Sequence, residues 1–409
     1  MQPLHGIKVV EMATFLAAPS CARFLADMGA EVIKVEPPEG ETVRFLSVGE
    51  GRPPGDIENT TFDLENANKS SICLDIKSRQ GREAMERLIA AADVFITNVR
   101  AKSLVKLGLD YEALKVKYPK LVVGTVTGYG EKGPARDLPG FDFTAYFARG
   151  GIMGTLYNKG ESPILPTAGF GDHPVGMYLT CGILAALYRA RETGRGDKVT
   201  VSLFHGGIWA VAVMLQSRQY GKEASNRPKS RKESPSPLVM AYETQDERWI
   251  QFAAPDYNAW YNAFVTAVGR EDLIGNSRYY PHTNVQTHLE EFYTLVKDTI
   301  AQKDCNYWRE AFRKADIPYA VGQTWDELLV DEQAWANDCF YKMEYPTGAS
   351  RTLVRPPVMF MDTPLPEYKR GPYQGEQTEE ILARLGYSQE QIKAMMLAGD
   401  ALCVPPREK

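Results

Sequence analysis

The amino-acid sequence predicts an α/β fold with a mainly parallel sheet in a chain of more than one domain. One observation predicts the sheet and a second predicts the number of domains. Short apolar runs typical of buried strands alternate with segments of helical periodicity through residue 127, as in sheets whose parallel strands are joined by crossover helices. The chain of 409 residues, 44% of them hydrophobic, is also long enough for two or three domains. The predicted strands are residues 7–11, 31–36, 71–76, 94–97, 121–127 and 198–203, and the first helices are residues 19–28 and 81–92.

The first β-α-β unit resembles a dinucleotide-binding motif. Its helix at 19–28 ends at Gly29, and its second strand ends on an acid, Glu36. Ala17, Ala18 and Pro19 stand where the glycine fingerprint of that motif would lie, and without glycine the backbone cannot approach a pyrophosphate. We therefore expect a Rossmann-like scaffold that does not use NAD or FAD.

Changes in composition and in hydrophobic periodicity along the chain predict three segments. Residues 1–220 form a large Rossmann-like domain, residues 221–320 a small α+β domain, and residues 321–409 a return segment that completes the large domain. The remaining expectations are a long loop at 37–64, a buried helix at 141–147, a helix at 205–219, a polar and basic linker at 220–237, a strand pair at 239–243 and 249–253, and helices at 378–385 and 388–396.

The composition excludes several classes of function. The net charge of −5 gives no basic field for nucleic acid or for an acidic membrane surface. No apolar run approaches the roughly 18 residues of a membrane span, and the six cysteines form no C-x-x-C pair, as is typical of a reducing cytoplasm. The five histidines lack metal-ligand spacing. We expect a cytoplasmic protein that has no membrane or nucleic-acid partner and no metal site.

The candidate catalytic residue is Asp172, which stands before a predicted buried helix at 174–191. An aspartate there is often an N-cap, because its oxygens accept hydrogen bonds from free backbone N–H groups. A carboxylate nucleophile at the same position would be held ionised by the helix dipole. The local pattern leaves both interpretations open, and they do not exclude each other.

Several short sequence motifs, spread over nearly the whole chain and in a fixed order, resemble those of the family III CoA-transferases. They are GAEVIKVE at 29–36, NANKSSICLDIK at 66–77, the Gly171-Asp172 pair, and TGRG at 193–196. ENTTFDLEN at 58–66 and DEQAW at 331–335 are similar to the branch that acts on 2-hydroxy acids such as phenyllactate and 2-hydroxyisocaproate in amino-acid fermentation.

The resemblance implies an aspartyl intermediate chemistry. Asp172 would attack an acyl-CoA, such as a 2-hydroxyacyl-CoA or 2-enoyl-CoA, to form a mixed anhydride, and then an aspartyl-CoA thioester, before CoA passes to a free 2-hydroxy acid. Coenzyme A is thus a cosubstrate, and no permanently bound cofactor is expected. The backbone N–H groups near Gly169 and Gly171 are the candidates for stabilising the oxyanion.

The family motif assigns CoA binding to the large domain. Leu74, Leu107, Asn98 and Val99 would surround the adenine, and Lys77 and Lys106 would lie near the phosphates. The family also implies an interlocked homodimer of ring-like chains, and the branch implies a possible association with a 2-hydroxyacyl-CoA dehydratase.

Three departures from the formyl-CoA transferases bear on the substrate. Leu16 replaces a glutamine near the thioester, Pro37 replaces an arginine, and no glycine run follows Tyr220, so oxalate and formate are poor candidates. The aromatic residues Phe141, Phe143, Tyr146 and Phe147 are expected instead to wall a pocket for an apolar side chain.

Two alternative functions are weighed against the transferase. The α-methylacyl-CoA racemases share the fold but use a histidine where this chain has Phe141, and phenylalanine cannot move a proton. A non-catalytic acyl-CoA-binding subunit would lack the nucleophile, and Asp172 is present.

Overall fold

The computed structural model describes residues 1–53, 55–221, 227–364 and 366–407, and it divides into two compact units. The larger unit comprises Met1–Met153, Leu165–Val213 and Glu332–Lys409, and the smaller comprises Gly154–Ile164 and Met214–Asp331. The sequence places the two boundaries at 220 and 320 instead and does not assign residues 154–164 to the smaller unit. That segment carries no periodic pattern of its own. It joins the smaller unit through pairing with the predicted linker, where Asn158 bridges Lys229.

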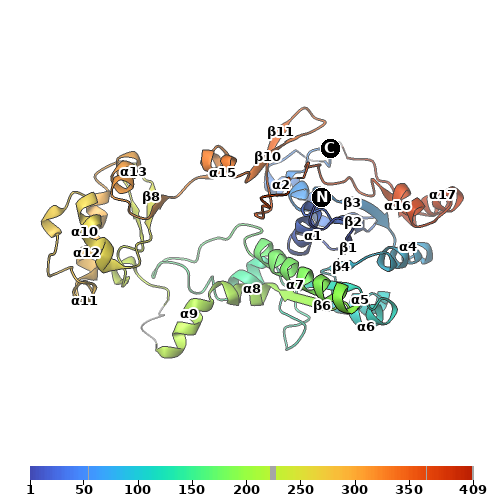
Figure 1. Cartoon of the computed structure of the whole chain (residues 1–409), viewed down its shortest axis with the longest axis horizontal. Helices are drawn as coiled ribbons and strands as arrows, with labels where there is room; N and C mark the ends of the chain where they lie inside the picture. Colours follow the sequence, from blue (N-terminus) through green and yellow to red (C-terminus); the bar gives the residue numbers. More distant parts are fainter. Residues whose placement is uncertain (54, 222–226, 365, 408–409) are drawn as a thin grey trace. The chain divides into compact units, whose positions relative to one another are not determined.

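The larger unit is built on a seven-stranded sheet of order β12-β3-β2-β1-β4-β5-β6 (Figure 1). Every neighbouring pair is parallel except β12 with β3. The α/β class and the Rossmann-like sheet predicted from the sequence are therefore confirmed. The strands are β1 (Lys8–Met12), β2 (Glu31–Glu36), β3 (Ser70–Leu74), β4 (Val94–Thr97), β5 (Val122–Thr127), β6 (Lys198–Ser202) and β12 (Ala401–Leu402).

The strand order reverses between β1 and β4, which pair side by side. In open α/β sheets, ligands bind at the carboxyl ends of strands where the order reverses, because the following loops diverge there. The loops after Met12 and Thr97 therefore mark the edge of the sheet where a site is expected.

Helices cover both faces of this sheet because the strand side chains alternate between two cores. Val9 faces the core that contains α1 and α7, whereas Val10 faces the core that contains α4, α16 and α17. The helices of this unit include α1 (Ala17–Asp27), α3 (Thr60–Asn66), α4 (Arg79–Ala90), α5 (Ala101–Leu107), α6 (Tyr111–Lys117), α7 (Asp172–Thr193), α8 (Leu203–Ala210), α16 (Thr378–Arg384) and α17 (Gln389–Ala398).

Helices α1 and α7 pack closely because Gly176 has no side chain. A Cβ at Gly176 would lie 2.0 Å from Ser20 Oγ and 2.7 Å from the carbonyl oxygen of Ala17. The first turns of the two helices are thereby held together. The residues just before them, Leu16 and Gly171, consequently lie on the same side of the larger unit.

The smaller unit contains an antiparallel sheet of order β7-β8-β9 with its own core. The predicted strand pair is confirmed as β7 (Ala241–Glu243) with β8 (Trp249–Phe252), and β9 (Tyr319–Val321) adds a third strand. Its helices are α10 (Tyr257–Ala267), α11 (His282–Val285), α12 (Leu289–Ile300), α13 (Cys305–Lys314) and α14 (Trp325–Leu329). Part of the predicted linker, residues 222–226, lies outside the described residues.

Two expectations about local structure were wrong in part. Residues 37–64 are not one loop, because α2 (Ser47–Glu50) and the first part of α3 lie within them. Asn59 starts α3 by accepting a hydrogen bond from the N–H of Phe62 at 3.0 Å. The single helix expected at 205–219 is divided, with α8 ending at Ala210 and α9 (Ala212–Ser217) following.

Candidate active site

Asp172 is the first residue of α7, and Gly171 rather than Asp172 is the N-cap. No side chain caps this helix end, so the interpretation of Asp172 as a capping residue is wrong. Within the described part of the chain, the Asp172 carboxylate accepts no hydrogen bond. Its oxygens are therefore available to another molecule.

The ionisation of Asp172 is controlled by its surroundings. Burial, reinforced by the charges of Asp142 and Glu65, raises the pKa of Asp172 from 3.8 to about 7, against an opposing effect of His173. The helix dipole was expected to keep the carboxylate ionised. Desolvation by the protein outweighs that effect because a charge is costly in a medium of low dielectric constant. Asp172 consequently exchanges its proton near neutral pH.

Asp142 organises the turn that leads to Asp172. This buried carboxylate is the first residue of the π-helix η2 (Asp142–Ala148), and its Oδ2 accepts the N–H of Gly169 at 3.0 Å. The Gly169 N–H is thereby engaged, whereas the Gly171 N–H has no partner among the described residues. Of the two oxyanion candidates, Gly171 is the one with a free donor.

Gly171 is held against the ring of Tyr146. A Cβ at position 171 would lie 2.5 Å from Tyr146 Cγ, so the backbone comes this close only because the residue is glycine. Tyr146 is buried in the same core as Val175, in the next turn of α7. The turn that carries Asp172 is therefore fixed from below by the sheet core.

His173 points to a buried acid on another helix. Its Nε2 lies 2.7 Å from Glu65 Oε1 on α3, and the Glu65 side chain is only 1% exposed. Burial lowers the pKa of His173, but the hydrogen bond to Glu65 and the charges of Glu65, Asp172 and Asp142 together raise it above its ordinary value. Sequence reasoning missed Glu65, although Phe62, Glu65 and Asn66 have the spacing of one helix face.

The loop after β1 brings a second aromatic residue to Phe141. The Asn98 side chain holds this loop through both backbone groups of Thr14. Its Oδ1 accepts the Thr14 N–H at 3.1 Å, and its Nδ2 donates to the Thr14 carbonyl at 2.7 Å. The next residue, Phe15, has φ of +63° and meets the Phe141 ring edge to face at 5.4 Å. Phenylalanine rarely adopts positive φ, and such outliers cluster at functional sites.

The expected aromatic wall is only partly formed by the residues predicted for it. Phe141 and Phe143 are 51% and 42% exposed, whereas Tyr146 and Phe147 are buried in the core below η2. Phe147 contacts Phe170 edge to face at 6.1 Å, and that ring lies beside Gly171 in sequence. The exposed aromatic side chains of this region are therefore Phe141, Phe143 and Phe170, and the half-buried Phe15 packs against Phe141.

The residues predicted to bind CoA lie where β3 and β4 end and on α5. Leu74, Val99 and Leu107 share one apolar cluster, and Leu74 is fully buried in it, so its side chain is not open to a ligand. The Asn98 side chain is engaged by Thr14, as described above. Lys77 and Lys106 are exposed and make no ion pair within the described chain, which leaves both ammonium groups available to phosphates.

A network of buried charges lies at the start of the loop that follows β1. Lys34 Nζ contacts Glu11 Oε1 at 2.9 Å and Glu41 Oε2 at 3.1 Å, and it donates to the Ala13 carbonyl at 3.0 Å. Lys69 Nζ binds the other oxygen of Glu11 at 2.6 Å. Buried charges require such pairing, and the network anchors the start of the loop that carries Phe15.

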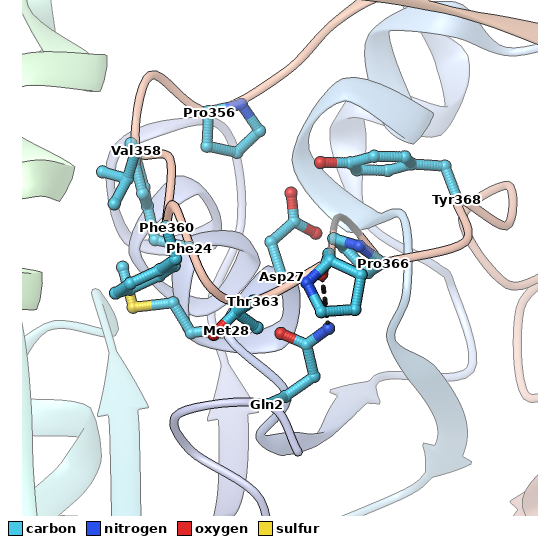
Figure 2. A pocket seen from close by; sticks show the side chains of 11 residues that line it. Gln2, Phe24, Asp27, Met28, Pro356, Val358, Phe360, Thr363, Pro366 and Tyr368 are labelled. Carbon is cyan, nitrogen blue, oxygen red and sulfur yellow. Dashed lines mark hydrogen bonds between the residues drawn. The ribbon is translucent and has the colours of Figure 1, made fainter. Parts of the chain in front are cut away.

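A small cavity beside α1 belongs to a different part of the larger unit (Figure 2). It holds about 20 Å³, room for roughly one water molecule. It lies between α1 and the C-terminal stretch that contains Pro356 and Pro364, and the Gln2 side chain donates to the Pro364 carbonyl at 2.9 Å. None of its lining residues is a predicted site residue. We interpret it as a packing gap.

Neither a metal centre nor a membrane-spanning helix is found among the described residues. No group of three or more histidine, cysteine, aspartate or glutamate side chains in the described ranges is arranged to hold a metal ion. No helix among these same residues has the length and apolar character needed to cross a membrane.

An unpaired carboxylate at the start of a buried helix, in a mainly parallel α/β unit, is an arrangement suited to an enzyme that works by covalent catalysis. The model of CoA-transferase family III matches residues 4–378, so the chain belongs to this family and is a CoA-transferase. The resemblance found in the sequence is confirmed.

Characterised relatives and a solved structure agree with this assignment. The chain is 50% identical to the cinnamoyl-CoA:phenyllactate CoA-transferase of Clostridium sporogenes over 391 residues, 95% of each chain. It is 44% identical to the (R)-2-hydroxy-4-methylpentanoate CoA-transferase of Clostridioides difficile, over 95% of this chain and 97% of that enzyme. A CaiB/BaiF family protein from Brucella suis superimposes with a TM-score of 0.78 at 28% identity, covering 94% of this chain and 99% of that one.

Proposed function

We propose that this enzyme moves CoA from a 2-hydroxyacyl-CoA or 2-enoyl-CoA to a free 2-hydroxy acid that carries an apolar side chain. The two relatives named for phenyllactate and for 2-hydroxy-4-methylpentanoate support this class of substrate, because each covers almost the whole chain. The interlocked homodimer, the cytoplasmic location and the association with a dehydratase stay predictions of the family resemblance.

The first step of the proposed mechanism is attack by the Asp172 carboxylate on the thioester carbonyl. The C–S bond breaks, CoA leaves as the thiolate, and Asp172 becomes one half of a mixed anhydride. The thiolate then attacks the aspartyl carbonyl and releases the first acid as its carboxylate. An aspartyl-CoA thioester remains, so the thioester energy is kept.

The second half repeats these steps with the incoming acid. Its carboxylate attacks the aspartyl-CoA carbonyl, expels the thiolate and forms a second anhydride. The thiolate attacks the acyl carbonyl of the new acid, which gives the product acyl-CoA and regenerates ionised Asp172. No net proton is gained or lost, which suits a site whose nucleophile must begin and end as a carboxylate.

One observation carries the proposal: the Asp172 carboxylate has no hydrogen-bond partner among the described residues, and the residue before it, Gly171, has a backbone N–H without a partner there. A capping or structural aspartate would be hydrogen bonded. A nucleophile needs free oxygens, and an adjacent N–H group can bind the oxyanion that develops on attack.

Trapping of the anhydride tests this mechanism. Hydroxylamine added together with acyl-CoA is expected to inactivate the enzyme and to leave a hydroxamate at Asp172, because an acylated carboxyl group is open to attack by amines. Peptide mass spectrometry locates the modification, and hydroxylamine without acyl-CoA is the control. A hydroxamate on another residue, or none, would contradict the covalent intermediate.

The aromatic surface predicts the order of acceptor acids. Phe15 and Phe141 lie edge to face at 5.4 Å and offer apolar area to a phenyl or branched alkyl group. With one acyl-CoA donor, 2-hydroxy acids with such side chains are expected to exceed oxalate and formate in kcat/KM by at least about tenfold, since burying one such side chain contributes about 1.5–3 kcal/mol. Equal rates with oxalate would contradict the assigned substrate class.

A further inference from the structure

We propose that His173 and Glu65 act as a positioning pair, in which a histidine cation held by a buried carboxylate keeps Asp172 in its attacking, ionised form. This inference rests on the proposed role of Asp172 as the nucleophile. His173 is not assigned a contact with the substrate, and its effect passes through Asp172.

The geometry of the pair is well defined. His173 Nε2 and Glu65 Oε1 are 2.7 Å apart, and they join the first turn of α7 to α3. The Glu65 side chain is 1% exposed, so its charge is costly without a partner. His173 itself is 43% exposed, which places the imidazole between the buried acid and the open side of the site.

The position of Glu65 is fixed by the backbone around it. The Arg23 guanidinium, from α1, donates to the carbonyl oxygens of Asp63 and Leu64 at 3.0 and 2.8 Å. Asn66, on the other side of Glu65, accepts Lys69 Nζ at 3.0 Å. Since α1 also packs on α7 through Gly176, the helices that carry the two partners share a common support.

Three carboxylates converge on this corner of the larger unit. Asp172 is on α7, Asp142 faces it from η2, and Glu65 faces it from α3, and all three act electrostatically on His173. The Lys69 ammonium acts on Glu65 but is already bound by Glu11 and Asn66. His173 therefore supplies the cation that offsets the acidic neighbours of Asp172.

This balance has a consequence that a purely structural contact would not have. In the paired state the His173 cation offsets part of the Glu65 charge at Asp172, so burial and Asp142 are the main causes that raise the pKa of Asp172. If His173 is removed alone, Glu65 is left as an unpaired anion, and the pKa of Asp172 rises further above its value of about 7. If both are made neutral, the balance is restored.

The pH dependence of kcat/KM for the acyl-CoA substrate tests the inference. In the unaltered enzyme the rate is expected to fall below about pH 7, where Asp172 becomes protonated. His173→Gln is expected to move this acid limb upward by about one pH unit, with about a tenfold loss at pH 6 and much less at pH 9. The double variant Glu65→Gln/His173→Gln is expected to return the limb to within about 0.3 unit of the original.

Control variants separate this inference from a folding defect and from the proposed function. His282→Gln, in the smaller unit, removes a histidine that contacts the carbonyl oxygen of Pro235 at 2.7 Å and pairs with no acid among the described residues, and it is expected to leave the profile unchanged. Asp172→Asn is assayed alongside to test the nucleophile itself. An unshifted acid limb in His173→Gln, or a double variant that shifts as far as the single one, overturns the positioning role even if Asp172→Asn is inactive. Normal turnover by Asp172→Asn overturns the proposed function instead.

Discussion

Asp172→Asn is expected to lower kcat for CoA transfer by about 10⁴-fold or more, because removal of a covalent nucleophile eliminates the pathway rather than weakening it. The same substitution is expected to stabilise the fold above pH 7. The amide is similar in size to the carboxyl group and carries no charge to bury. Activity and stability therefore change in opposite directions at one residue.

The sign of the stability effect follows from the pKa. Burial, together with Asp142 and Glu65, raises the pKa of Asp172 from 3.8 to about 7, so the folded state binds the proton more tightly than the unfolded state. Stability from this group is complete below about pH 4 and is lost as the pH rises through 7. The gain in Asp172→Asn should therefore be about 2–4 kcal/mol at pH 8 and close to zero at pH 4.

Two measurements check this expectation. Exchange of CoA between an acyl-CoA and a labelled free acid gives kcat, and denaturant unfolding at pH 4 and pH 8 gives the free energy of unfolding. Asp137→Asn is the matched control, because this residue is 51% exposed and pairs with Lys102 on the surface. If Asp172→Asn gained nothing at pH 8, the carboxylate would not be the desolvated group that the structure describes.

The sheet was predictable from the sequence because its strands are buried and apolar. The range predicted for β2 agrees with the structure residue for residue, as does that for β4, and both strands lie inside the sheet. The edge strand β12 has only two residues and forms through pairing with β3. It is too short to show a period-two hydrophobic pattern in the sequence. Periodicity reports burial, and it is weak where burial is slight.

The components of the site were less predictable because they depend on contacts between distant segments. A motif indicates Asp172, but its acidic neighbours Asp142 and Glu65 lie 30 and 107 positions earlier in the chain. Glu65 lies in α3, which has only seven residues and begins inside the predicted loop, so no helical period marks it in the sequence. The positive φ of Phe15 has no signal in the sequence, because phenylalanine does not favour that conformation.

The ionisation of Asp172 shows how local reasoning can reach the right residue for an incomplete reason. A helix N-terminus favours an anion by about 0.3–1 kcal/mol at an exposed position. Burial beside two further carboxylates acts in the opposite direction and prevails, with a pKa of about 7 as the result. Only the structure reveals which effect is larger, because desolvation depends on segments that are remote in sequence.

The second large effect is expected at Lys34, a buried residue that holds the start of the Phe15 loop through the Ala13 carbonyl. Lys34→Met is expected to destabilise the protein by about 3–5 kcal/mol, since it leaves buried carboxylates without their cation. Glu11 keeps Lys69 as a partner at 2.6 Å, but Glu41 loses its partner at 3.1 Å. Denaturant unfolding at pH 8 measures the loss, and Lys120→Met on the surface is the control.

The pH dependence and a second substitution identify the charge responsible. Burial raises the pKa of Glu41 to about 7 even with Lys34 present, and removal of Lys34 raises it further, so the defect of Lys34→Met should grow as the pH rises above 7 and should be smaller at pH 6 than at pH 8. Lys34→Met/Glu41→Gln should recover part of the loss at pH 8 for the same reason. A defect that is equal at pH 6 and pH 8, and that the second substitution leaves unchanged, would assign the loss to packing or to the hydrogen bond from Lys34 to Ala13. That hydrogen bond anchors the loop of Phe15, so recovery of stability without recovery of activity would show that Lys34 also positions the site.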